Sequence, residues 1–473
     1  MSKNNFLGRT DSVEGTGLVI GGIYFLESLA VVGFLAWYRT LAYESVGDAL
    51  LTMWGMIGMG ALVGAAVLAF LIARACYRLR QAGSNTWVLG LVMNILVVGT
   101  LFPAAEVVLR RVAVGDSAYD VRLGGYRLYP RQWQKVTSTY GTVLEKAQRY
   151  PTYLISDDAL GWTVGPNRTS ENALYVSSAE GLRSPVKGAV LKSEQRPCRI
   201  ALIGDSYTFG ENVAFEDTWG SVLDSLLGRR CQILNFGVIG YGIDQMYLRY
   251  LHDVRSWHPD LVIVAFIDHD LRRTMTSYGF LTFPDGRFPF IKPRFVLRGN
   301  ELEVINHPLI SSQQLFGNPS IHDLPFIKYD IGYEPSEWDR PGLAFATRSY
   351  LFRVLYTFMR PLDRLGRPET SLSETTELNR ALLLKLREAI ESDGAKPLMV
   401  SLPTEWERMD GLDRTKGGQL LTDAHITHLE LTSCMKPFAT KDLYNAPAAG
   451  GHYSVKGNRE VANCLIGDVK SML

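Results

Sequence analysis

The chain has 473 residues, more than one ordinary domain, and a net charge of +1 with its lysines and arginines spread along it. This spread argues against a nucleic-acid partner, because nucleic-acid-binding proteins concentrate basic residues on one face. The mean hydropathy of +0.01 is high for a purely soluble protein. We therefore expect the apolar residues to be unevenly distributed along the chain.

Three apolar segments open the chain. Residues 17–37 contain one charged residue, Glu27, and residues 49–73 and 87–105 contain none. Because about 20 apolar residues cross a bilayer, we predict three transmembrane helices within residues 17–111. A cleaved signal peptide is the alternative for the first segment, but the segment is long for one and shows no small-residue cleavage pattern.

The basic residues beside these segments predict their orientation. With three spans, one side of the membrane carries Lys3, Arg9, Arg74, Arg78 and Arg80, and the other carries Arg39, Arg110 and Arg111. Cytoplasmic loops are the richer in Lys and Arg, so residues 1–16 are predicted to be a cytoplasmic tail. We expect a multi-pass protein of the cell membrane, with the lipid bilayer as a partner. Its large C-terminal part would then be extracytoplasmic, and periplasmic in a bacterium with two membranes.

Residues 112–197 are predicted to form a connecting region with short extended pieces, and we assign no chemistry to it. From residue 198 onward the pattern alternates between strands and helices, which is typical of a three-layer α/β sheet. Strands are expected at residues 199–203, 232–236, 261–267, 397–402 and 426–431. Helices are expected at residues 218–227, 349–359 and 375–390. Another is expected after residue 242 and ends at about residue 252, and the last begins at about residue 455. An insertion at about 272–343, rich in Phe, Pro and Tyr, is either a functional lid or binding surface, or an extra hairpin that only packs.

The segment Ile200–Gly210 predicts a nucleophile. Four apolar residues are stopped by Gly-Asp-Ser and followed by a second Gly, which indicates a buried parallel strand that ends in a tight turn. Ser206 would then lie at the carboxyl end of a strand, where open α/β sheets bind ligands, and is a candidate for nucleophilic catalysis. The alternative is that Asp205 and Ser206 only begin the next helix.

Other polar residues close the later strands. Asn235 and Gly240 follow the second strand, His269 follows the third, and His452 lies in a Gly-His-Tyr-Ser sequence that opens the last helix. Together with Gly-Asp-Ser, these residues resemble the four signature blocks of the SGNH, or GDSL-type, hydrolase superfamily. The resemblance covers residues 198–473.

The resemblance implies a flavodoxin-like three-layer α/β sheet and a serine esterase mechanism. In the family, the first-block serine attacks an ester carbonyl, which corresponds to Ser206, and a C-terminal histidine is the base, which corresponds to His452. The serine N–H, the second-block glycine and the third-block residue form the oxyanion hole, which implies Gly240 and His269 here. An ester hydrolase needs such a hydroxyl, base and set of donors on chemical grounds alone.

Two positions depart from the family pattern. His269 stands where the family has asparagine, although a neutral imidazole still donates one hydrogen bond. Ala449 stands three residues before His452, where the family has its acid. In serine proteases the loss of this acid costs on the order of 10⁴ in turnover. A backbone carbonyl or another acid, such as Asp442, is a candidate substitute.

We therefore expect a membrane-anchored extracytoplasmic serine esterase that removes O-acetyl or other short acyl groups from a cell-envelope glycan. Its partner would be an acylated carbohydrate or another ester. Two alternatives remain open: an O-acyltransferase that works with a second membrane protein as acyl donor, and an inactive glycan-binding module. We expect no cofactor and no metal site, because the histidines are scattered and no H-x-x-x-H or C-x-x-C spacing occurs.

Five cysteines suggest two disulfides. Cys76 lies in the expected cytoplasmic loop, which leaves four cysteines in an oxidising space. Cys198 and Cys231 each precede one of the first two strands, which are neighbours in this fold class, so we expect them to pair. Cys434 and Cys464 would then pair by elimination. The alternative is four buried free thiols.

Overall fold

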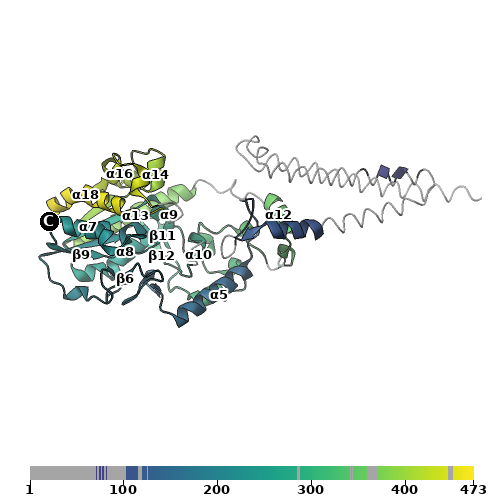
Figure 1. Ribbon diagram of the computed structural model, residues 1–473, viewed down its shortest axis with the longest axis horizontal. Coiled ribbons are helices and arrows are strands. Elements are labelled where there is room, and N and C mark those ends of the chain that lie inside the picture. Colours follow the sequence, from purple (N-terminus) through teal and green to yellow (C-terminus); the bar gives the residue numbers. More distant parts are fainter. Residues whose placement is uncertain are drawn as a thin grey trace, which may run out of the picture. The chain divides into compact units, whose positions relative to one another are not determined.

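A computed structural model of the chain describes residues 71, 74–75, 77–78, 81, 103–115, 120–124, 126–284, 288–340, 342, 345–359, 370–445 and 451–473 (Figure 1). The three expected membrane spans lie almost wholly outside these residues, as do the expected tail and Cys76. Within the described ranges, no helix combines the length and the apolar character that crossing a bilayer requires. The spans and their orientation stay predictions.

The chain divides into two compact units. Met1–Gln132 and Ser336–Gly366 form the first, called here the N-terminal unit, and Trp133–Pro335 and Arg367–Leu473 form the second, the α/β unit. The expected domain boundaries stay predictions. The sequence predicts one connecting region at residues 112–197. In the structure, residues 133–197 belong to the α/β unit.

A five-stranded parallel sheet is the centre of the α/β unit, with the strand order β14-β13-β10-β8-β9. The strands are β8 (Cys198–Gly204), β9 (Cys231–Asn235), β10 (Leu261–Phe266), β13 (Lys396–Ser401) and β14 (His428–Glu430). These bounds lie within a few residues of the expected ones. The predicted parallel α/β sheet is therefore confirmed.

Strand β8 shows why the sheet is covered on both faces. Ile200 and Leu202 belong to one hydrophobic cluster, and Ala201 and Ile203 belong to another, as expected when successive side chains point to opposite faces. The first cluster is completed by α7 (Trp219–Leu226) and α18 (Val455–Met472), and the second by α8 (Ile243–His252) and α13 (Thr370–Ser392) (Figure 1). The result is three layers with Ser206 at the carboxyl edge of the middle one.

Shorter elements complete the α/β unit. Its other strands are β4 (Leu154–Asp157), β5 (Gly161–Val164), β6 (Val176–Ser177), β7 (Arg183–Ser184), β11 (Phe295–Arg298) and β12 (Glu301–Val304). Its other α-helices are α5 (Trp133–Arg149), α6 (Ser206–Phe209), α9 (Asp268–Arg273), α10 (Gly279–Thr282), α11 (Ser312–Phe316), α14 (Glu405–Met409), α15 (Lys416–Asp423), α16 (Leu431–Met435) and α17 (Thr440–Leu443). Its 3-10 helices include η1 (Leu191–Ser193), η2 (Phe215–Asp217), η3 (Val254–Trp257), η4 (Ile321–Asp323) and η5 (Ile327–Tyr329).

Residues before the first sheet strand pack closely against it. Trp162 in β5 is buried, and its Nε1 donates a hydrogen bond of 2.9 Å to the carbonyl of Ile239. Its ring contacts Tyr241, and also Phe288 and Phe290 of the insertion. An aromatic cluster therefore joins β5, the insertion and the loop before α8 into one core.

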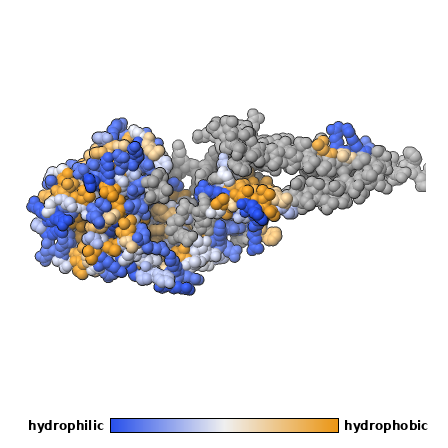
Figure 2. All heavy atoms as spheres, viewed as in Figure 1, coloured by the Kyte–Doolittle hydropathy of each residue, from blue (hydrophilic) through white to orange (hydrophobic). Residues whose placement is uncertain are grey.

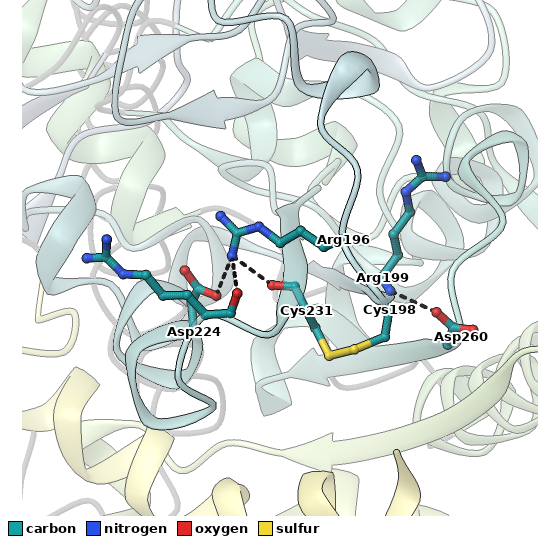
Figure 3. Close-up of a disulfide and its surroundings, with 7 residues drawn as sticks. Arg196, Cys198, Arg199, Asp224, Cys231 and Asp260 are labelled. Atoms are coloured by element: carbon teal, nitrogen blue, oxygen red, sulfur yellow. Dashed lines mark hydrogen bonds and ion pairs between the residues drawn. A yellow bond between two sulfur atoms is a disulfide. The ribbon is translucent and has the colours of Figure 1, made fainter.

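Both predicted disulfides are confirmed. Cys198 and Cys231 lie opposite each other at the start of β8 and β9 and are bonded (Figure 3). Nearby, Arg196 donates to the carboxylate of Asp224 and to the carbonyl of Cys231. Cys434 in α16 is bonded to Cys464 in α18. The first bond lies at the end of the sheet opposite Ser206.

The N-terminal unit contains a helix at residues 103–112, β1 (Val114–Gly115), β2 (Val121–Leu123), β3 (Tyr126–Arg127), η8 (Ala346–Arg348) and α12 (Tyr350–Met359). The carboxylate of Glu106 accepts hydrogen bonds from the hydroxyl of Ser349 and from the N–H groups at the start of α12. Hydrophobic residues gather on the surface of this unit around α12 (Figure 2). The exposed ones include Val107, Val108, Val112 and Phe358. The expected helix at residues 349–359 thus exists but belongs to this unit.

Candidate active site

Ser206 lies at the turn between β8 and α6. Asp205 caps α6, since its carboxylate accepts a hydrogen bond of 2.9 Å from the N–H of Tyr207. A Cβ at Gly204 would collide with the carbonyl of Ala265 on the neighbouring strand, so this position requires glycine. Asp205 and Ser206 thus do begin a helix, and the same turn exposes the Ser206 hydroxyl to the cavity described below.

His452 contacts this hydroxyl. Its Nε2 lies 2.9 Å from Oγ of Ser206, and its ring packs on Tyr207 with 5.0 Å between ring centroids. The Tyr207 hydroxyl donates to the carbonyl of Gly451, which fixes the backbone before His452. The turn after β8 and the segment before α18, far apart in the sequence, therefore meet as a nucleophile and a base would.

The second ring nitrogen of His452 lies 3.1 Å from Oδ1 of Asn212. An amide oxygen only accepts hydrogen bonds, so this contact places the proton on Nδ1 and leaves the Nε2 lone pair for Ser206. Asp442, the substitute acid suggested by the sequence, instead pairs with Lys456 at 3.0 Å. Ala449 lies outside the described residues. Asn212, which carries no charge, is thus the residue that contacts Nδ1 of His452.

A carboxylate does lie beside His452. Oε2 of Glu211 is 3.3 Å from Nε2 of His452, and the Glu211 side chain is only 26% exposed. Burial raises the pKa of Glu211 above its ordinary value. The interaction with His452 opposes this rise, and the nearby Asp205 adds to it. Neither Glu211 nor Asn212 is among the site residues predicted from the sequence.

The loop that carries Glu211 and Asn212 is held by Arg183. This buried guanidinium donates hydrogen bonds of 2.6 Å to the carbonyls of Phe209 and Val213, and another to the carbonyl of Gly210. It lies over the ring of Phe209 at 4.6 Å, and burial lowers the pKa of Arg183 to about 10, so it stays charged at neutral pH.

The same loop is also held by Tyr175. The backbone N–H of Asn212 donates a hydrogen bond of 2.9 Å to the hydroxyl of Tyr175. The centre of the Tyr175 ring lies 4.7 Å from the Arg183 guanidinium. Asn212 itself has a left-handed backbone with φ of 69°. Both Arg183 and Tyr175 come from the region to which the sequence assigned no chemistry. That region therefore holds the loop beside His452 in place.

Gly240 and His269 are the residues that the sequence predicts as oxyanion-hole donors. Together with Ser206 and His452 they line a single cavity of about 510 Å³. Asn235 supports this arrangement. Its side-chain amide donates a hydrogen bond of 2.9 Å to the carbonyl of Thr208 and accepts one of 2.9 Å from the N–H of Gly237. Burial and then Arg273 lower the pKa of His269, so its imidazole is neutral at pH 7 and keeps one N–H donor.

A fixed cation lies at the base of the cavity. Nη1 of Arg273 donates hydrogen bonds to the carboxylate of Asp270 at 2.5 Å, to the carboxylate of Asp205 at 3.2 Å and to the carbonyl of Tyr241 at 3.2 Å. Both carboxylates are fully buried. The network therefore ties the turn after β8 to α9, which begins where β10 ends.

The remaining cavity walls differ in character. The lining includes four apolar side chains, which are those of Ile239, Ile267, Phe283 and Phe288. Thr404, Glu405 and Trp406 also line the cavity, and Trp406 is 61% exposed. In the described part of the chain no cluster of three or more His, Cys, Asp or Glu side chains is suited to hold a metal ion.

Comparison with known proteins bears on the segment around the nucleophile. The model of the GDSL-like lipase/acylhydrolase family matches residues 200–282. No curated protein matches the sequence.

Solved structures also match, each over somewhat more than half of this chain. A member of the lipolytic protein G-D-S-L family from Veillonella parvula is 11% identical, covers 58% of this chain and 99% of its own, and has a TM-score of 0.30. The lipase/acylhydrolase from Enterococcus faecalis is 12% identical, with 59% and 96% covered and a TM-score of 0.30. An acetylxylan esterase from Geobacillus stearothermophilus is 13% identical, with 58% and 95% covered and a TM-score of 0.30. The family match spans Ser206, Gly240 and His269, and it lies in the part of the chain that contains strands β8, β9 and β10 of the parallel sheet.

Proposed function

We propose that this protein is a serine ester hydrolase in which Ser206 is the nucleophile and His452 the general base. The observation that carries the proposal is the 2.9 Å contact between His452 Nε2 and Ser206 Oγ inside a cavity that Gly240 and His269 also line. Serine and histidine in hydrogen-bond contact are the arrangement that activates a hydroxyl for attack on a carbonyl.

The reaction follows from this geometry. His452 Nε2 takes the proton of Ser206 as Oγ attacks the ester carbonyl, and the N–H groups of Ser206 and Gly240 and the imidazole N–H of His269 donate to the oxyanion. The imidazolium then gives its proton to the leaving alkoxide, which departs as an alcohol and leaves an acyl-serine. Water, deprotonated by His452, attacks the acyl-serine and releases the carboxylic acid and the free hydroxyl.

The substrate in this proposal is an O-acetyl or other short acyl ester on a cell-envelope glycan. The exposed indole of Trp406 at the cavity rim supports it, because an exposed aromatic ring offers an apolar face with a polar edge to a sugar. The cavity of about 510 Å³ has room for a short acyl group beside a sugar ring.

The location in this proposal is the outer side of the cell membrane, to which the N-terminal apolar segments anchor the chain. The two disulfides support an oxidising compartment, where such bonds persist. The exposed apolar side chains around α12 support a membrane-facing role for the N-terminal unit.

Acyl transfer is a second candidate, and the uncharged Asn212 favours it. A histidine without a charged partner on Nδ1 activates water less strongly, which lengthens the life of the acyl-serine and gives a glycan hydroxyl time to attack. This route would need an acyl donor supplied by a second membrane protein.

The test is an assay of the full-length protein in detergent on p-nitrophenyl acetate and p-nitrophenyl octanoate, with and without an oligosaccharide acceptor. Parent protein should release p-nitrophenol, faster from the acetate, and Ser206→Ala and His452→Ala should each lose at least about 10³-fold in kcat. Acetylated oligosaccharide as a product would identify transfer. Equal rates for the parent and Ser206→Ala would refute both enzymatic readings and leave the glycan-binding module.

A further inference from the structure

We propose that Glu211 is the counter-charge of the catalytic histidine, so that the usual acid is divided between two neighbouring residues. Asn212 orients the imidazole through Nδ1, and Glu211 stabilises the imidazolium from the Nε2 side. The inference rests on the proposed roles of Ser206 and His452 and assigns to the same reaction a further residue that the family blocks do not contain.

The geometry separates the two tasks. Orientation needs an acceptor on Nδ1, and Asn212 Oδ1 at 3.1 Å provides it. Charge stabilisation needs a carboxylate near the ring, and Glu211 Oε2 lies 3.3 Å from the Nε2 atom that receives the serine proton. Because opposite charges a few ångströms apart in a partly buried site attract strongly, Glu211 favours the transition state in which His452 is charged.

The second argument is the cost of keeping Glu211 ionised. It is faced by Asp205, Arg273, Arg183 and His452, of which Asp205 is also an acid and is fully buried. Arg273 is engaged by Asp205 and Asp270, and Arg183 by three backbone carbonyls. Of the side chains that the structure describes, none other than His452 is recorded in an ion pair with Glu211. A partly buried carboxylate placed this way is explained by a cation that appears during the reaction.

The loop is built to hold this position. Arg183 binds the carbonyls on both sides of Glu211, and Tyr175 accepts from the N–H of Asn212. The two side chains are adjacent in sequence but reach opposite nitrogens of one ring. The left-handed backbone of Asn212 follows directly after Glu211, and such a reversal turns successive side chains in different directions.

The test compares Glu211→Gln, Glu211→Gln with Asn212→Asp, and the control Glu216→Gln, which removes an exposed carboxylate from η2. The readouts are kcat and KM for p-nitrophenyl acetate and the rate at which a fluorophosphonate labels Ser206. Labelling needs an activated serine but no natural substrate. Glu211→Gln should lower kcat and the labelling rate about 30-fold with KM within twofold, whereas Glu216→Gln should match the parent. The double variant Glu211→Gln with Asn212→Asp should have a kcat at least tenfold above that of Glu211→Gln alone, because the new carboxylate places a negative charge beside Nδ1.

Each other outcome decides against the proposal. Unchanged kcat in Glu211→Gln, a change confined to KM, or failure of Asn212→Asp to restore activity would each overturn the counter-charge role. The proposed function fails in a different way, since the parent would then not be labelled at all or Ser206→Ala would be labelled equally.

Discussion

The amide oxygen of Asn212 lies 3.1 Å from Nδ1 of His452, the position at which a serine hydrolase usually has a carboxylate. Removing the amide should release the imidazole from its orientation. We expect Asn212→Gly to lower kcat by about 10²-fold, and glycine is chosen because the left-handed backbone at this position disfavours other replacements. Asn212→Asp should raise kcat for hydrolysis above the parent. Equal kcat for the parent and Asn212→Gly would contradict this role.

His269 is expected to donate to the oxyanion in place of the family's asparagine. Removing a single donor of this kind costs about 10² to 10³ in kcat. We therefore expect His269→Ala to lose about 10²-fold in kcat with a small change in KM, and His269→Asn to keep activity within about fivefold, because its amide also donates. Steady-state kinetics on p-nitrophenyl acetate measure both. If His269→Asn were as inactive as His269→Ala, His269 would have another role.

The local pattern was sufficient to predict the sheet, the nucleophile turn and the disulfides. A short apolar run such as Ile200–Ile203 that ends in Gly-Asp-Ser is typical of a buried parallel strand, and Gly204 is required where the turn passes the next strand. Cys198 and Cys231 pair because they begin neighbouring strands in register. These inferences depend on neighbours in the sequence or in a known sheet order.

The partners of His452 could not be predicted in this way. Whether Asn212 or Asp442 meets the ring depends on the path of a loop that Arg183 holds from outside the sheet. Asp442 is close to His452 in sequence, but its carboxylate is held by Lys456. A usable signal did exist: asparagine after Gly-Glu, directly behind the nucleophile turn, is a residue type that favours left-handed backbone.

Arg183 should be required for activity although it does not line the cavity. Arg183→Lys keeps a positive charge but cannot donate to the three carbonyls of the loop at once. Each buried acceptor left unpaired costs about 1 to 3 kcal/mol, so we expect a lower free energy of unfolding and a kcat reduced at least tenfold. Denaturant unfolding and kinetics measure the two effects. Lys192→Ala, which alters a lysine in η1, serves as the control and should leave kcat unchanged.

The bond between Cys434 and Cys464 should stabilise the α/β unit without taking part in catalysis. It closes a loop with a sequence separation of 30, for which the chain-entropy model gives about 3.6 kcal/mol. The double variant Cys434→Ser with Cys464→Ser should lose about that much free energy of unfolding and keep the parent kcat at 25 °C. Reduction by dithiothreitol should lower the melting temperature of the parent. In the double variant the drop should be smaller, because only the Cys198–Cys231 bond is left to reduce. A full-length parent with all five thiols open to alkylation would refute both bonds.

Glu211→Gln should reduce activity while increasing stability, and the two effects should depend on pH in a defined way. Burial raises the pKa of Glu211 in the folded state above the ordinary value of 4.5, so the folded protein binds this proton more tightly than the unfolded chain does. Its contribution to the free energy of unfolding is therefore largest below the ordinary pKa and is lost as the pH rises through the raised one.

Gln cannot ionise, so the variant lacks this loss. At pH 7.5 the melting temperature of Glu211→Gln should exceed that of the parent by more than it does at pH 4. Activity should show the opposite order, since the parent gains its counter-charge as Glu211 ionises. The measurement is the melting temperature and the fluorophosphonate labelling rate of both proteins from pH 4 to pH 8.5. If Glu211→Gln melted lower than the parent throughout this range, Glu211 would be a residue that stabilises the fold. The loss of activity would then follow from the loss of stability and would contradict the counter-charge role.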